Sequence, residues 1–164
     1  MKLLLVRHAA AVPRGTPSIP DDDRPLTPEG KEKFRVAAKG LARIAHRPDV
    51  LLTSPLPRAR ATAEIAARAF KRITPTVDPA LARESVAGIV AALKTHPLSA
   101  TVAIVGHEPV LSALLAHLLG AAHGERLAFK KGGAALIDLP DGPSSAGRLI
   151  WFLKPRILRT LAGE

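Results

Sequence analysis

The sequence predicts an α/β protein of three layers, with helices on both faces of a mostly parallel central sheet and an antiparallel hairpin at its C-terminal edge. Short apolar runs alternate with segments of helical periodicity, which is typical of parallel α/β sheets. The last two apolar runs follow one another across a turn-rich segment, which indicates a hairpin. The chain has 164 residues and 47% hydrophobic content, so we expect a single domain over residues 1–164.

The first two elements are a buried strand and an amphipathic helix. The strand covers residues 2–6, "KLLLV", and ends before Arg7. The helix lies in "TPEGKEKFRVAAKGLARIA", where Thr27 is the expected N-cap, Pro28 the first helical residue and Glu29 part of the first turn. Apolar side chains recur behind this cap at helical spacing, so one face of the helix should pack on the sheet.

The remaining elements continue the alternation. In chain order they are a strand at residues 49–54, a helix through "PRARATAEIAARAF", a helix at residues 86–93, a strand at residues 101–105, a helix in "PVLSALLAHLL" that stops at Gly120, and strands in "GAALIDL" and "RLIWFL". The C-terminal "PRILRTLAGE" is basic and partly apolar, and we expect a tail packed on the domain.

Polar side chains stand where three of the predicted parallel strands end. Arg7 and His8 follow the first strand, and Arg58 lies one helical turn beyond the end of the second. The third strand ends in "VGHEP", which contains His107. Ligands of open α/β sheets bind at the carboxyl ends of the strands. We therefore expect Arg7, His8, Arg58 and His107 to share one rim of the sheet.

Two arginines and two histidines on one rim point to phosphoryl transfer. Guanidinium groups bind phosphoryl oxygens with two parallel hydrogen bonds and keep their charge, and a neutral imidazole is a competent nucleophile. A lone histidine at a strand end would more often be structural. The alanines at positions 9–11 either leave room for the phosphoryl group or pack under a neighbouring helix.

The charge balance favours an anionic partner and argues against nucleic acid. The chain carries 24 Lys and Arg against 14 Asp and Glu, a formal net charge of +10, which attracts anions. A biased genome composition explains the excess equally well. Aromatic residues make up only 3%, so stacking platforms for bases are scarce. There is no apolar run of about 18 residues, no secretory h-region and no cysteine, so we expect a cytoplasmic protein that does not bind a membrane.

Four segments resemble the histidine phosphatase superfamily, whose fold is phosphoglycerate mutase-like, and within it the SixA-type phosphohistidine phosphatases. In chain order they are "VRHAAA", "DRPLTPEGKEKFRVAAKGL", "LLTSPLPRARATAEIA" and "AIVGHEPVLSALL". The resemblance covers nearly the whole chain. The alanine after the histidine of the first segment is closer to the SixA branch than to the Arg-His-Gly of the mutases.

The resemblance implies a role for each rim residue. His8 would be the nucleophile that becomes phosphorylated, while Arg7, Arg58 and His107 would form the phosphate pocket. No cofactor is implied, and two histidines lack the further ligand that a catalytic metal needs. We expect a metal-independent phosphatase acting on phosphohistidine of a histidine phosphotransfer domain. The alternatives are a broad small-molecule phosphomonoesterase and a non-catalytic module that binds phosphorylated ligands.

A general acid is the part that the sequence does not identify. Mutases and many phosphomonoesterases of the superfamily carry one, usually Glu, in mid-chain. Here "VDPALARESVAGI" offers Asp78 and Glu84, neither in a recognisable motif, and we expect Glu84 to cap or open the helix near Ser85. Asp21, Asp22 and Asp23 follow the first strand and could approach the site, but a solvated loop is the favoured interpretation.

The short chain leaves little room for a lid over the site. An open site without an acid suits a leaving group that departs easily, as the imidazole of phosphohistidine does, and it admits a side chain presented by a protein. Both features favour a phosphoprotein over a sugar phosphate. Lys130 and Lys131 precede a glycine pair, and we expect a solvated turn there, with contact to the phosphate or to an acidic partner as the alternative.

Overall fold

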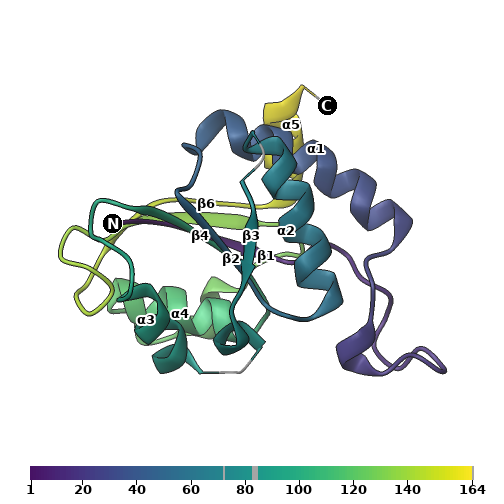
Figure 1. The fold of residues 1–164 in the computed structure, drawn as a ribbon, viewed down its shortest axis with the longest axis horizontal. Helices are drawn as coiled ribbons and strands as arrows, with labels where there is room; N and C mark the ends of the chain where they lie inside the picture. Colours follow the sequence, from purple (N-terminus) through teal and green to yellow (C-terminus); the bar gives the residue numbers. More distant parts are fainter. Residues whose placement is uncertain (72, 83–84, 164) are drawn as a thin grey trace.

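A mixed sheet between two layers of helices forms the fold (Figure 1). The computed structural model describes residues 1–71, 73–82 and 85–163, and in these residues six strands form one sheet. The strands are β1 Lys2–Arg7, β2 Val50–Thr53, β3 Pro75–Val77, β4 Thr101–Gly106, β5 Ala134–Asp138 and β6 Arg148–Leu153. The helices are α1 Pro28–Ile44, α2 Pro57–Ala69, α3 Val86–Leu93, α4 Val110–Leu119 and α5 Pro155–Ala162.

The sheet has the strand order β3-β2-β4-β1-β5-β6. Strands β1 to β4 pair in parallel, β5 runs antiparallel to β1, and β6 runs antiparallel to β5. The parallel centre and the C-terminal antiparallel hairpin confirm the predicted fold class.

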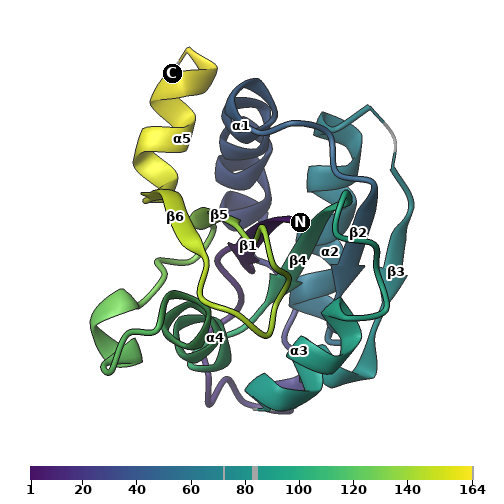
Figure 2. The ribbon, with the colours of Figure 1, turned by 90° about the vertical axis from the view of Figure 1, so that its left-hand side faces the viewer.

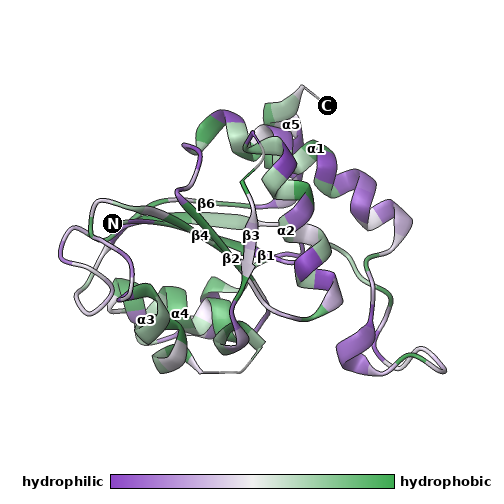
Figure 3. Ribbon diagram, in the orientation of Figure 1, coloured by the Kyte–Doolittle hydropathy of each residue, from purple (hydrophilic) through white to green (hydrophobic). Residues whose placement is uncertain are grey.

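Each face of the sheet has its own helices and its own core. Figure 2 shows α1, α2 and α5 on one face and α3 and α4 on the other. Side chains of a strand alternate between faces, so Leu4 and Val6 of β1 join the core under α1, and Leu3 and Leu5 join the core against α4. Hydropathy follows this arrangement, because α4 is apolar along most of its length whereas α1 alternates polar and apolar residues (Figure 3).

The start of α1 determines the path of the chain after β1. Thr27 caps the helix, since its Oγ1 accepts a hydrogen bond from the Gly30 amide at 2.9 Å. The Thr27 amide donates to the Ala10 carbonyl, and a Cβ at Gly30 would clash with that same carbonyl oxygen. Ala11 is buried and forms a bridge with Leu26. Packing against the helix therefore accounts for Ala10 and Ala11.

Two elements differ from the sequence prediction. Strand β3 was not predicted, because its segment is short and flanked by prolines. The expected C-terminal tail is the helix α5, which packs on α1 with Leu158 fully buried and the Leu158 carbonyl directly against Gly40. Within the described residues, none of the helices combines the length and apolarity needed to cross a membrane.

Candidate active site

The carboxyl ends of β1, β2 and β4 bring the four predicted rim residues together. Arg7 at the end of β1 lies in register with Gly106 of β4, and the His8 amide donates to the Gly106 carbonyl at 3.0 Å. The rings of His8 and His107 are 5.1 Å apart between centroids. In Figure 1 the loop that carries Asp21–Asp23 extends from this end of the sheet.

The surroundings of His8 fix its tautomer. Its Nδ1 lies 2.7 Å from the Ala9 carbonyl oxygen, which can only accept, so Nδ1 carries the proton and Nε2 keeps its lone pair. Burial lowers the pKa of His8 to about 3, with further lowering from His107, Arg58 and Arg7, although the bond to Ala9 acts in the opposite direction. A neutral ring with a free Nε2 is the form that attacks phosphorus.

His107 presents two ring nitrogens that are buried and lack a hydrogen-bond partner among the described residues. Burial lowers its pKa to about 4, and the positive charges of Arg58 and Arg24 lower it further. Buried polar atoms normally find partners. A phosphoryl oxygen between the rings and the guanidinium groups would supply one.

Arg7 and Arg58 each have one nitrogen that donates to a backbone carbonyl and another nitrogen without a partner among the described residues. Arg7 Nη1 donates to the Phe129 carbonyl at 2.5 Å, and Arg58 Nη1 donates to the Asp21 carbonyl at 2.8 Å. The Nε of each arginine is buried and has no partner among the described residues. Burial lowers the pKa of both guanidiniums. An anion beside the unpartnered nitrogens would compensate for this burial of charge.

Thr62 links the segment after β1, which carries His8, to the helix that carries Arg58. Its Oγ1 accepts a hydrogen bond from the Ala9 amide at 3.1 Å and donates to the Arg58 carbonyl at 2.7 Å. Thr62 is fully buried and lies one helical turn after Arg58 on α2. This contact sets the distance between β1 and α2 beside the site.

The structure adds Arg24 and Asp21 to the site. Arg24 is buried, its Nε lies 2.9 Å from Asp21 Oδ1, and its charge acts on both Arg58 and His107. Arg14 also pairs with Asp21 at 2.9 Å, and Arg58 Nη2 lies 3.8 Å from Asp21 Oδ2. The loop is solvated at Asp22 and Asp23, as expected, whereas Asp21 is partly exposed and approaches the site through these arginines. Arg24 was not singled out within "DRPLTPEG" from the sequence. Its burial is what marks it as part of the site, and burial cannot be read from one sequence.

The remaining candidates lie outside the rim or outside the described residues. Glu84 lies outside the described residues, while Ser85 caps α3 through its side chain. Asp78 Oδ1 accepts a hydrogen bond from the Ala80 amide and so organises a local turn. Lys130 and Lys131 are exposed beside the turn that precedes β5.

Asp21 is not suited to proton donation. Its hydrogen bond with Arg14 lowers its pKa, and Arg24 lowers it further, so the carboxylate stays ionised near neutral pH. Within residues 1–71, 73–82 and 85–163, no three His, Asp or Glu side chains lie together as metal ligands would.

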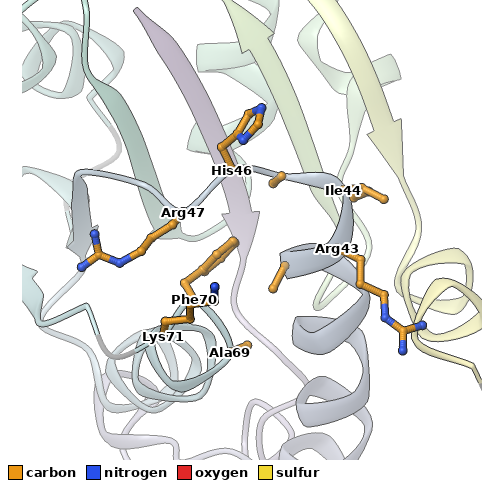
Figure 4. Close-up of a pocket in the computed structure, with 9 residues that line it drawn as sticks. Arg43, Ile44, His46, Arg47, Ala69, Phe70 and Lys71 are labelled. Carbon is orange, nitrogen blue, oxygen red and sulfur yellow. The ribbon is translucent and has the colours of Figure 1, made fainter.

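A separate hollow of about 320 Å³ lies beside the C-terminal ends of α1 and α2 (Figure 4). It is lined in part by Arg43, Arg47 and Phe70. The guanidiniums of Arg43 and Arg47 point away from one another in Figure 4, and Arg43 donates to the Leu161 carbonyl of α5. The basic side chains there do not converge, in contrast to those at the rim.

The two site histidines should stay neutral in mildly acidic solution. Because burial lowers the pKa of His8 to about 3 and of His107 to about 4, their imidazole NMR signals should not shift between pH 8 and pH 5.5. A free histidine titrates near pH 6.5. As pH falls, the two histidines become protonated in the unfolded chain near pH 6.5, well before they do so in the folded protein. The free energy of unfolding therefore decreases as pH falls below about 6.5, and these two groups do not change it above that pH. A titration midpoint near 6.5 for either ring would contradict this assignment.

The chain is similar in sequence and in fold to known proteins. The model of the histidine phosphatase superfamily (branch 1) matches residues 3–85. An uncharacterised protein of Picosynechococcus sp. is 35% identical over 145 residues, which cover 87% of this chain and 86% of that protein.

Solved structures of SixA-type proteins have a similar fold. A structure from Agrobacterium tumefaciens, assigned as the phosphohistidine phosphatase SixA, has 28% identity and a TM-score of 0.79, covering 94% of this chain and 98% of that one. The protein histidine phosphatase SixA complexed with tungstate has 25% identity and a TM-score of 0.78, covering 96% and 99%. The alpha-ribazole phosphatase of Shigella flexneri, at 20% identity, a TM-score of 0.75 and coverage of 94% and 97%, shares the fold alone.

Proposed function

The chain belongs to the histidine phosphatase superfamily (branch 1) and is a phosphatase, and we propose that it removes the phosphoryl group from phosphohistidine on a phosphotransfer protein. In the proposed reaction, His8 Nε2 attacks phosphorus while the bond from phosphorus to the leaving group breaks. Water then attacks the phosphoryl group on His8, which releases inorganic phosphate and restores the neutral ring. The catalytic residues would be His8, Arg7, Arg58 and His107.

The observation that carries this proposal is the His8 ring itself. It is buried, its Nδ1 proton is held by the Ala9 carbonyl, and its Nε2 has no hydrogen-bond partner among the described residues and lies on a ring beside His107. The transition state of phosphoryl transfer is loose, so the protein mainly positions the reactants and neutralises charge on the oxygens. Arg7 and Arg58 would supply that charge, and His107 would donate a hydrogen bond from the ring nitrogen that carries its proton.

The acids around the rim support phosphohistidine as the substrate. Asp21 is held ionised by arginines, and both carboxylate oxygens of Glu108 accept hydrogen bonds from Phe129 and Ser112. Neither acid is placed to protonate an alkoxide. The imidazole of phosphohistidine takes its proton from solvent on its second nitrogen and leaves as a neutral ring, so it needs no acid from the protein. The SixA-type relatives at 25–28% identity support the same substrate class.

A comparison of leaving groups tests the proposed substrate. The protein should hydrolyse a phosphohistidine peptide and p-nitrophenyl phosphate, while kcat/KM for glucose 6-phosphate should be lower by at least about a hundredfold, the smallest usual contribution of a general acid. Glu84→Gln should keep phosphohistidine turnover within a few-fold of the wild type.

Two results would contradict the proposal in different ways. Efficient turnover of glucose 6-phosphate together with a large loss in Glu84→Gln would identify a general phosphomonoesterase with Glu84 as its acid. Binding of phosphate without hydrolysis of any of the three substrates would identify a module that binds phosphorylated ligands.

A further inference from the structure

Glu108 follows His107 directly and connects two parts of the site. Its Oε1 accepts a hydrogen bond from the Phe129 amide at 2.6 Å. Its Oε2 accepts from the Ser112 hydroxyl at 2.7 Å and from the Ser112 amide at 3.3 Å. Ser112 lies in the first turn of α4, whereas Phe129 lies beyond the end of that helix. The carboxylate therefore ties the segment before β5 to the start of α4.

That segment, residues 129–133, holds the end of the nucleophile strand. The Phe129 carbonyl accepts from Arg7 Nη1, and the Gly133 carbonyl accepts from the Arg7 amide at 3.0 Å. The Gly132 amide lies 3.1 Å from both the Arg7 and the His8 carbonyl oxygens. The same five-residue segment before β5 thus fixes the Arg7 side chain and the backbone on either side of His8.

The backbone of Phe129 is clamped from both sides. Its amide donates to Glu108 while its carbonyl accepts from Arg7, and its fully buried ring packs on Phe152 with centroids 4.6 Å apart. Without the carboxylate, the buried amide would lack its acceptor and the segment could turn to find another one. Any such rotation would move the carbonyl that orients the Arg7 guanidinium.

We infer that Glu108 is a positioning residue, which orients Arg7 for the phosphoryl group through the Phe129 backbone. The inference rests on the proposed role of Arg7 as a phosphate ligand. Glu108 does not contact the reacting atoms in this arrangement, and its two oxygens are occupied as acceptors. Its negative charge also acts on Arg7, so a role through the hydrogen bond has to be separated from a role through charge.

Two conservative variants separate the hydrogen bond from the charge. Glu108→Gln removes the charge but keeps an oxygen at the reach of the Phe129 amide. Glu108→Asp keeps the charge but withdraws the carboxylate by one methylene. Positioning through Phe129 predicts that Gln keeps kcat/KM for p-nitrophenyl phosphate within about fivefold of the wild type. The Asp variant should lose about tenfold or more, a loss typical of outer partners that orient ligands at metal sites.

A binding measurement makes the inference independent of turnover. Calorimetric titration with tungstate, an unreactive oxyanion, should show the same order of affinity: wild type, then Gln, then Asp. In an Arg7→Ala background, Glu108→Asp should weaken tungstate binding by less than about threefold, because the residue it orients is gone. Glu125→Gln, which removes an exposed carboxylate further along the chain, is the matched control and should behave as wild type.

The outcomes are distinguishable. If Asp binds tungstate as well as Gln or better, or if Asp weakens binding equally with and without Arg7, the inference is wrong and the proposed function is untouched. If the wild type binds tungstate but hydrolyses no phosphate compound, the proposed function fails while the order of tungstate affinities still decides the inference.

Discussion

His8→Ala should reduce phosphate release by about ten-thousandfold or more, because in covalent catalysis the nucleophile has no substitute. In the folded protein Nε2 of His8 is the free nitrogen of a ring whose other nitrogen is bonded to the Ala9 carbonyl. His107 is the other imidazole at this rim, with its ring centroid 5.1 Å from that of His8, so the double variant His8→Ala/His107→Ala shows whether any remaining turnover uses the second ring. The measurement is the rate of phosphate release from p-nitrophenyl phosphate at saturating enzyme.

The covalent intermediate gives a second readout for the same prediction. Wild-type protein quenched in neutral denaturant during turnover should carry phosphate that is lost in acid, as expected for a bond from nitrogen to phosphorus. His8→Ala should carry none. His123→Ala, a change at an exposed histidine, serves as the control for histidine content. Retained turnover in His8→Ala, or labelled phosphate on that variant, would overturn the mechanism.

Arg58→Ala should lower kcat/KM by about a thousandfold, since removal of one preorganised donor to a developing charge typically has this effect. The guanidinium is buried, its Nε has no hydrogen-bond partner among the described residues, and its Nη1 donates to the Asp21 carbonyl. Arg58→Lys should recover little of the loss, because an ammonium group cannot make two parallel hydrogen bonds to a phosphoryl group. Steady-state kinetics with p-nitrophenyl phosphate measures both variants.

A neighbour on the same helix provides the control for Arg58. Arg60 is exposed on α2, two residues further along, so Arg60→Ala removes the same charge without touching the rim. Its kcat/KM should stay within about twofold of the wild type. If Arg58→Lys is as active as the wild type, the bidentate contact is not used and Arg58 contributes only charge.

The sequence predicted elements whose signals are local. Thr27 and Pro28 marked the start of α1, Gly120 marked the end of α4, and the alternation of apolar runs predicted the parallel sheet with its C-terminal hairpin. The rim residues were predictable for the same reason. Arg7 ends β1, His8 and His107 come directly after β1 and β4, and Arg58 lies in the first turn of the helix that follows β2. The carboxyl ends of parallel strands lie at one edge.

The features that the sequence did not reveal depend on contacts between distant segments. The pairing of Asp21 with Arg24 and Arg58 depends on how the loop after β1 folds back on α2, and nothing in "PDDDRPL" distinguishes that from a solvated turn. The bond from Glu108 to the Phe129 amide joins residues that are 21 positions apart. Strand β3 is stabilised by pairing with β2 rather than by its own propensity.

Among the described residues, four buried nitrogens lack protein partners, two on His107 and one each on Arg7 and Arg58, and we expect them to make the folded protein responsive to the anions in its medium. Any oxyanion that binds there binds only the folded chain, so it shifts the unfolding equilibrium by mass action. At a concentration of a hundred times its dissociation constant, such an anion adds about 2.7 kcal/mol to the free energy of unfolding. Inorganic phosphate, the product, is one of these anions. Phosphate should therefore raise the melting temperature and, because it occupies the site that the substrate needs, lower the catalytic rate.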